Sequence, residues 1–503
     1  MSNSQELKKG AILSYATIVF NIITGLIYTP WMIKQIGVSD YGLYVLVTSF
    51  LTYFIMDFGL GDAVARFISK YRIENDEQKI NQILGLTSKI YLYINLCIFT
   101  ALVVFFFLLD NIFKELNDVE IEKFKSIYII AGLFSLLSFP FSSLNGVVIA
   151  FERFVFLKLC DFINKCLTIV LMVIALYFGY KLYSLVFINA LVGIFIIIIK
   201  LFYLRKHTNI NVDFKFKSKE LKKQIFGFSA WVTIIGIAQR LLINISPTLL
   251  AIYSGTTAIS IFSIGIIIEG YVWTFAGALN GMFLPRVTAL NSESNDKSKV
   301  TELMIKVGRI QLFVVGLLVI GIIIFGKEFI VLWMGEKFKE SYLVVILLVI
   351  PGLVPITQNI ASTLMYVENK LKYTALIYIC SSIVSIISSI FLIPKFGALG
   401  AALGISLGIS IFQVVVMNII YQKVMKINVV YFLKSSFVKM LPLFLIVIGI
   451  GLAMNYYIKT SDFFTLFVKA FIIGIVYLAL MFGFGLKKEE KDLFASVITK
   501  RFN

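Results

Sequence analysis

Long apolar segments follow one another along the whole chain and are separated by short polar loops. A helix needs about 20 apolar residues to cross the hydrocarbon core of a bilayer, and these segments reach that length. Inside hydrocarbon every backbone N–H and C=O must be paired, which a helix achieves within a single segment. The composition agrees, because 59% of the 503 residues are hydrophobic and only 15% are charged. The pattern therefore predicts an all-α, polytopic membrane protein.

The apolar segments number about fourteen by this length rule. Their approximate bounds are 11–33, 41–63, 82–109, 124–149, 155–178, 182–203, 224–251, 256–284, 301–325, 342–366, 373–393, 398–422, 436–457 and 463–486.

Lysine and arginine are distributed unevenly between the loops. The loops "ARFISKYRIENDEQK" and "LRKHTNINVDFKFKSKELKK" are basic, whereas "YSGTTAI" and "GYKLY" on the opposite side are nearly uncharged. Basic loops stay in the cytoplasm, so both termini are predicted to be cytoplasmic. The net charge of +18 then lies mostly beside the membrane, where it attracts anionic lipid. We therefore expect no nucleic-acid partner.

The polar residues offer little for catalysis. His207 is the only histidine and lies in a lysine-rich loop, which excludes a histidine-based metal centre. The loops predicted outside are too short for a catalytic domain. We expect neither an enzyme nor a bound metal or cofactor. The four cysteines fall inside apolar runs, without the spacing of a metal site or a disulfide framework: Cys97, Cys160, Cys166 and Cys380.

Weak sequence matches recur in order along the chain. Pro30 and Gly37 in "YTPWMIKQIGVS" return as Pro247 and Gly255 in "ISPTLLAIYSGT". All the matches are separated by roughly 215 to 220 positions, which indicates an internal duplication. The other pairs are Arg66 with Arg286, Pro140 with Pro355, Glu152 with Glu368, and Phe178 with Phe396.

The duplication predicts how the chain is divided. A shift of six spans returns the chain to the same side, so the two halves have parallel orientation and are related by a pseudo-twofold axis along the membrane normal. The predicted divisions are a six-helix bundle over 1–210, a second six-helix bundle over 211–428, and an appended helix pair with a tail over 429–503. A cavity at the seam between the bundles is the expected binding site.

The stretch "MDFGLGDAVARF", at the end of the second predicted span, is polar for such a place. Asp62 and Arg66 are four residues apart, so on a helix they share a face and can form an ion pair. Asp57 lies more than a turn deeper, where a lone carboxylate is costly unless it faces a cavity or a partner. Gly59 and Gly61 would let a neighbouring helix approach closely.

This stretch also carries a resemblance to a known family. "IGVSDYGLYVLVTSFLTYFIMDFGLGDAVARFISKY" is similar to the span-one to span-two signature of bacterial Wzx-like polysaccharide flippases, in the multidrug/oligosaccharidyl-lipid/polysaccharide (MOP) superfamily. "IPKFGALGAALGISLG" at 393–408 resembles the small-residue motif that opens the twelfth span in that family. "FLPRVTAL" at 283–290 and "LLVIPGLVPI" at 347–356 lie where the family has related segments.

The resemblance implies a function in the bacterial inner (plasma) membrane. Such proteins flip undecaprenyl-diphosphate-linked oligosaccharides from the cytoplasmic to the outer leaflet by alternating access. The implied partners are that lipid-linked glycan and membrane lipids, with the polysaccharide polymerase machinery as a further candidate. The number of predicted spans instead matches lipid II flippases, so lipid II is an alternative cargo.

Basic residues inside the spans suit a diphosphate cargo. Arg240 and Lys165 lie near mid-span and Lys89 lies shallower, while Lys200 is close enough to a span end for its side chain to reach the interface. A charge at mid-span costs several kcal/mol, so such a side chain faces water, a ligand or a carboxylate. Guanidinium groups suit phosphate oxygens through paired hydrogen bonds. Arg240, Lys165 and Lys89 are the predicted head-group contacts.

Three acidic residues accompany them: Asp57, Asp161 and Glu269. One interpretation couples flipping to a proton or Na⁺ gradient through Glu269 or Asp57. The other makes these residues structural counter-ions, with Arg240 paired to Glu269 or Asp57 and Lys165 paired to Asp161. The sequence leaves both open.

A multidrug extruder of the same superfamily is the second alternative. Such extruders export cations with the help of acidic residues in spans one and seven. Here span one, "AILSYATIVFNIITGLIYTPWMI", carries no charge, and span seven carries Arg240 and no acid. The pattern therefore favours an anionic cargo.

Overall fold

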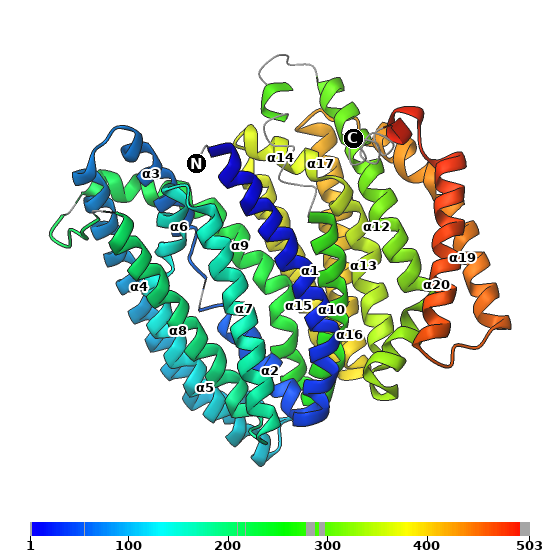
Figure 1. Cartoon of the computed structure of the whole chain (residues 1–503), viewed down its shortest axis with the longest axis horizontal. Coiled ribbons are helices and arrows are strands. Elements are labelled where there is room, and N and C mark those ends of the chain that lie inside the picture. Colours follow the sequence, from blue (N-terminus) through cyan, green and yellow to red (C-terminus); the bar gives the residue numbers. More distant parts are fainter. Residues whose placement is uncertain are drawn as a thin grey trace. The chain divides into compact units, whose positions relative to one another are not determined.

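The computed structural model describes residues 3–54, 56–208, 210–216, 218–277, 287–290 and 297–492, and their regular structure is helical, without strands (Figure 1). Thirteen helices in this part of the chain are long and apolar enough to cross a membrane. A further apolar helix, Val38–Leu51, is shorter. The chain is therefore a multi-pass helical membrane protein, as its apolar pattern predicts. The motif segment 283–286 and its Arg286 lie outside the described residues.

The helices from residue 3 to residue 277 follow each other along the chain. They are α1 (Asn3–Ile36), α2 (Val38–Leu51), α3 (Leu60–Ile73), α4 (Glu77–Ile112), α5 (Asp118–Ser138), the 3₁₀ turn η1 (Phe139–Phe141), α6 (Ser143–Ala150), α7 (Phe154–Tyr177), α8 (Leu182–His207), α9 (Lys219–Tyr253) and α10 (Thr256–Gly277).

The remaining part of the chain adds a second series that includes three π-helical segments. The elements are α12 (Lys297–Met334), η3 (Glu336–Phe338), α13 (Ser341–Thr357), α14 (Asn359–Val367), α15 (Leu371–Phe396), α16 (Ala398–Gly408), π segment η4 (Ile409–Val416), α17 (Met417–Lys423), α18 (Val429–Leu433), π segment η5 (Lys434–Val438), α19 (Lys439–Tyr457), α20 (Phe463–Leu480) and π segment η6 (Met481–Gly485).

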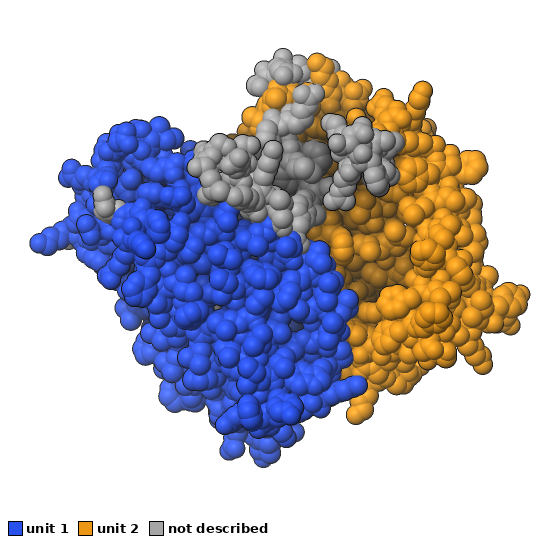
Figure 2. All heavy atoms as spheres, in the orientation of Figure 1, with its two compact units in different colours: residues 1–260, 393–397 blue, residues 261–392, 398–503 orange. Residues whose placement is uncertain are grey.

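Packing groups the chain into two compact units, coloured separately in Figure 2. The first comprises residues 1–260 and 393–397, and the second comprises 261–392 and 398–503. Helix α9 packs with α2 and α3 inside the first unit, although the duplication assigns it to the second half. The predicted divisions at 210 and 428 stay predictions, because a repeat boundary and a packing boundary need not coincide.

The surface of helix α4 has a buried side and an exposed apolar side. Its apolar residues Ile83 and Ile98 are buried, whereas Leu96, Val104 and Phe107 are exposed. Exposed apolar area on this scale is typical of a surface that faces lipid rather than water. Within the first unit α4, α5 and α8 lie side by side (Figure 1).

Helices α3 and α6 pack at very short range, and this contact fixes the position of α3. A Cβ added to Gly146 would lie 2.2 Å from the carbonyl oxygen of Gly61, so only glycine permits this approach. Val64 and Ile68 of α3 are fully buried in the same apolar cluster, together with Val148 of α6. The end of α3 that follows the polar stretch is therefore packed closely against α6.

The duplication is visible in the turns. Gly37 and Gly255, which are 218 positions apart, both have positive φ at the end of a long helix (φ 92° and 82°). Gly179 and Gly397 repeat the same spacing, again with positive φ. The turns after α6 and α14 share a hydrogen-bond pattern, and in each one non-glycine residue has positive φ: Glu152 and Asn369.

Each of these last two turns also carries an ion pair. Arg72 at the end of α3 bonds to Glu152 with an Nη2–Oε1 distance of 2.8 Å. In the second unit Glu368 bonds to Lys297 of α12 and to Lys370, the latter at 2.8 Å. Burial raises the pKa of Glu368, but the hydrogen bonds and charges of Lys297 and Lys370 outweigh it and hold the pKa below its usual range. Both halves thus use a glutamate in the turn to form an ion pair with the end of another helix.

One expected span is wrong in detail. Instead of a single helix over 41–63, the chain forms α2, which ends at Leu51, and α3, which begins at Leu60. No proline explains the interruption. Its cause is the polar stretch itself, whose backbone turns away from helical geometry between the two helices.

Candidate functional site

Asp57 lies between α2 and α3, three residues before α3 begins, rather than within the second helix. Its carboxylate accepts hydrogen bonds from the backbone N–H of Gly59 (3.0 Å) and of Gly61 (3.3 Å). These are N–H groups that have no partner inside a helix, and a negative charge is favourable at this end of the helix dipole. Phe58 and Gly59 both take left-handed conformations, with φ of 52° and 65°. Together these features produce the interruption between α2 and α3.

Helix α9 holds this interruption from both sides. The Nη1 atom of Arg240 donates to the carbonyl of Thr52, just beyond the end of α2, at 2.7 Å. Two turns earlier in α9, the Thr233 hydroxyl donates to the carbonyl of Phe58. A cation is favourable at a helix C-terminus, so Arg240 also stabilises the end of α2.

A pocket of about 400 Å³ opens between the polar stretch and α9, entirely within the first unit. Its wall combines glycines, amides, a hydroxyl and charged groups, in contrast to the apolar helices around it. The lining residues are Met56, Asp57, Gly59, Asp62, Thr233, Gly236, Gln239, Arg240, Ile243 and Asn244.

The charges in this pocket are arranged asymmetrically. Asp57 is held by backbone N–H groups, and Asp62 is exposed on the first turn of α3. Arg240 is half-buried, and its partner in the described part of the chain is the Thr52 carbonyl rather than a carboxylate. A guanidinium has five N–H donors in a planar fork, so donors beyond this one bond are available to a ligand in the pocket.

The other predicted cations lie elsewhere. Lys89 of α4 donates to the carbonyl of Phe216 at 3.2 Å, in the loop before α9. Lys165 of α7 is exposed. Asp161, its proposed counter-ion, forms an ion pair with Lys158 at 3.4 Å. Neither lysine lines the pocket that contains Arg240 and Asp57.

Glu269 lies on α10 in the second unit and is 9% exposed. The side chain of Trp273, one turn further along α10, forms a hydrogen bond with its carboxylate. A buried carboxylate with an uncharged partner can gain or lose a proton or hold a cation, so the structure leaves Glu269 available for coupling.

Three other cations are buried, and sequence reasoning missed two of them, Lys469 and Arg309. Lys200 of α8, which the sequence places close to a span end, is 9% exposed and donates to Asn145 at 2.8 Å. Lys469 of α20 is 2% exposed and donates to Asn455, Thr460 and the carbonyl of Ile458. Both lie inside predicted spans, so the rule that found Arg240 applies to them equally.

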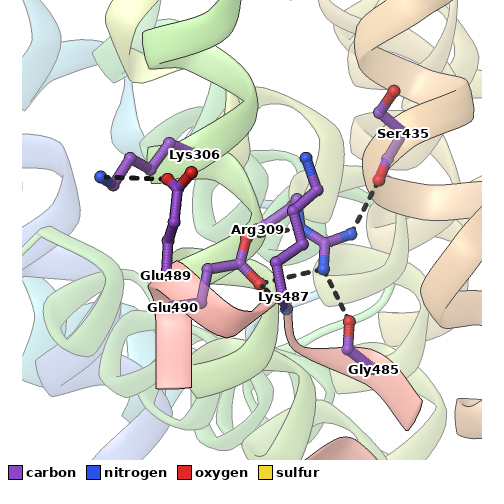
Figure 3. Close-up of polar contacts among 7 residues, drawn as sticks. All are labelled: Lys306, Arg309, Ser435, Gly485, Lys487, Glu489 and Glu490. Carbon is purple, nitrogen blue, oxygen red and sulfur yellow. Dashed lines mark hydrogen bonds and ion pairs between the residues drawn. The ribbon is translucent and has the colours of Figure 1, made fainter. Parts of the chain in front are cut away.

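The third is Arg309 of α12, which is 1% exposed (Figure 3). Its Nε and Nη2 atoms bond to the two carboxylate oxygens of Glu490 at 2.6 and 3.0 Å. Nη1 donates to the carbonyl of Ser435 at 2.8 Å, and Nη2 donates to that of Gly485 at 2.6 Å. Ser435 and Gly485 lie in the π segments η5 and η6, where the regular helical hydrogen-bond pattern is altered. One side chain thus joins α12 to both appended helices and to the segment after them.

Among the described residues no group of three histidine, cysteine or carboxylate side chains is placed to hold a metal ion. The pocket around Arg240 is lined by hydrogen-bonding groups and fixed charges.

Comparisons with known proteins identify the family of this chain. The family described as polysaccharide biosynthesis protein matches residues 7–281, more than half of the chain. A protein of Shigella flexneri named as an O-antigen transporter is 22% identical over 388 residues, which is 75% of this chain and 88% of that relative.

Solved structures share the fold. The lipid II flippase MurJ, in an inward closed conformation, has a TM-score of 0.69 at 16% identity and covers 94% of this chain and 98% of its own. A multidrug resistance MATE family transporter of the MOP superfamily, in an inward-facing conformation, has a TM-score of 0.66 at 14% identity and covers 80% and 96%.

The family match includes the polar stretch after α2 that carries the resemblance. The chain therefore belongs to the polysaccharide biosynthesis protein family, and it is similar in sequence to an O-antigen transporter and in fold to a transporter of the MOP superfamily.

Proposed function

We propose that this protein is a flippase that moves an undecaprenyl-diphosphate-linked oligosaccharide from the cytoplasmic to the outer leaflet by alternating access. The observation that carries the proposal is a polar pocket with an arginine in its wall, inside a chain of apolar helices. A diphosphate head group is charged and strongly hydrated, and it must cross about 30 Å of hydrocarbon. Fixed donors such as Arg240 can replace the lost water.

Arg240 is the proposed primary contact of the head group. Lys165 and Lys89 are secondary candidates, because neither lines the same pocket. The prenyl tail would remain in lipid while the glycan head enters the protein. Membrane lipid and the lipid-linked glycan are the proposed partners, and the polymerase machinery that would use the product is a further one.

The proposed location is the bacterial inner membrane, with both termini in the cytoplasm. The support is the distribution of lysine and arginine, which concentrates in the loops after α3 and α8.

Depletion of the protein tests this function. The expected result is accumulation of one lipid-linked glycan in the cytoplasmic leaflet, because its synthesis continues while its transfer stops. Mass spectrometry of extracted lipids identifies the glycan, and re-expression of the wild-type chain is the control. Drug sensitivity without accumulation would contradict the proposal and favour an extruder of the same superfamily.

Lipid II is the second candidate cargo. The likeness to the lipid II flippase MurJ extends over 94% of this chain. If lipid II rather than an oligosaccharide precursor accumulates on depletion, the cargo is lipid II and the transport mechanism is unchanged.

We also propose that flipping is coupled to a proton or Na⁺ gradient through Glu269, with Asp57 as the other candidate. Glu269 is favoured because backbone N–H groups already hold Asp57. In proteoliposomes, Glu269→Gln is expected to remove the dependence of flipping on the gradient, with Glu328→Gln as the control for loss of one carboxylate in the second unit. Wild-type flipping that ignores both gradients would refute the coupling.

A further inference from the structure

We propose that the interruption between α2 and α3 is a hinge that an anionic ligand releases through Arg240, and that Thr233 is the positioning residue that holds it closed. The inference rests on the proposed function, because it takes the ligand to be a diphosphate head group. It concerns Thr52–Phe54 and Met56–Gly59, which separate the two helices.

The backbone of this segment is strained. Phe58 has a φ of 52°, and a residue with a Cβ seldom adopts that conformation. Gly59 follows with a φ of 65°, where glycine carries no such penalty. Two consecutive left-handed residues persist only when their surroundings hold them in place.

The segment at the corresponding positions in the second half of the chain is helical. The turns at Gly37 and Gly255 are 218 positions apart, so residues 52–59 correspond to 270–277. There α10 continues as a helix to Gly277. The first half therefore departs from the helix that the second half forms, and its own contacts must stabilise the departure.

Those contacts divide into two groups. On one side the ring of Phe58 packs edge-on against buried Phe139, with centroids 6.1 Å apart. On the other side lie polar contacts: Asp57 with the first amides of α3, Thr233 with the Phe58 carbonyl, and Arg240 with the Thr52 carbonyl. Asp57, Thr233 and Arg240 all line the pocket. A ligand that enters the pocket can therefore reach these polar contacts.

A ligand can shift this equilibrium only by binding one state better than the other. Phosphoryl oxygens are stronger acceptors for a guanidinium than a peptide carbonyl is, because both partners are charged. A head group that draws the Arg240 guanidinium away from the Thr52 carbonyl removes one of the two bonds from α9. The Thr233 hydrogen bond is then the remaining one of the two bonds from α9. Binding of the head group thereby allows α3 to move relative to α2.

Hydrogen exchange of the full-length protein in lipid nanodiscs tests the hinge, with undecaprenyl diphosphate as the probe. The readout is the exchange rate of the amides in Gly59–Ala63, measured without and with the probe. Thr233→Val removes the hydrogen bond to the Phe58 carbonyl and leaves Arg240 intact. Thr248→Val is the matched control, because it makes the same change on α9 at a buried hydroxyl that has no hydrogen-bond partner among the described residues.

Without probe, Thr233→Val is expected to raise the exchange rate at these amides by roughly three- to tenfold, the effect of losing one hydrogen bond, while Thr248→Val leaves it unchanged. With probe, the wild-type rate is expected to rise, and the Thr233→Val rate to rise further, because the second of the two bonds from α9 is then lost as well. An unchanged exchange rate in Thr233→Val overturns the proposal that Thr233 holds the hinge closed. Bound probe without faster wild-type exchange overturns the ligand response, although the proposed function would stand. A probe that does not bind refutes both the response and the proposed cargo.

Discussion

Replacing Arg309 with methionine is expected to lower the free energy of unfolding by about 3–5 kcal/mol, because it leaves the Glu490 carboxylate buried without its counter-charge. Glu490 is 2% exposed, and its oxygens otherwise bond only to the backbone N–H of Lys487 in the described residues. The carbonyls of Ser435 and Gly485 lose their donor in the same variant. The contact between α12 and the appended helices α19 and α20 should therefore loosen first.

Thermal unfolding in detergent, followed by loss of monodisperse protein, measures this effect. Neighbouring charges provide the controls: Lys306 and Glu489 pair at 3.8 Å and are largely exposed, so Lys306→Met and Glu489→Gln should change stability by less than about 1 kcal/mol. The double variant Arg309→Met with Glu490→Met should recover much of the loss, because it removes both buried charges. Wild-type stability of the Arg309→Met variant would show that the pair contributes nothing.

Arg240→Ala is expected to reduce flipping by roughly 10- to 100-fold, which corresponds to loss of a charged hydrogen-bonded contact with the head group. Arg240→Lys should retain part of the activity, because lysine keeps the charge and loses the planar fork. The measurement is transfer of the lipid-linked glycan in proteoliposomes, at equal amounts of inserted protein.

Gln239→Ala provides the control for Arg240, since Gln239 is the preceding residue and also lines the pocket. It should transport almost normally. The site proposal fails if Arg240→Ala inserts normally and supports wild-type export. If Gln239→Ala is equally defective, the role of the Arg240 charge is refuted, because the shape of the pocket would then explain the loss of transport.

Much of this architecture could be predicted from the chain alone. Apolar length predicts where helices cross lipid, because hydrocarbon forbids unpaired backbone groups wherever the segment lies. The duplication could be read from Pro30, Gly37 and their counterparts, and the positive φ at Gly37 and Gly255 explains why glycine recurs there. The cost of a charge in lipid drew attention to Arg240, which the structure places in a pocket wall.

Sequence patterns could not predict the role of a charged residue where that role depends on its spatial neighbours. Asp57 looks like a carboxylate stranded in a span, but it caps α3 because α2 has already ended. Arg309 and Lys469 satisfy the same criterion as Arg240, yet their donors bond to groups inside the second unit. Only spatial neighbours separate a charge that stabilises packing from one that faces a pocket.

The sequence by itself determined that this chain is a helical, internally duplicated membrane protein with cations where lipid penalises them, because each of those properties follows from local composition and period. The tertiary structure alone decided which cation is available to a ligand. Arg240 is brought against the interrupted α2–α3 segment by α9, which is nearly 190 positions away along the chain, and such long-range contacts leave no periodic trace in a sequence.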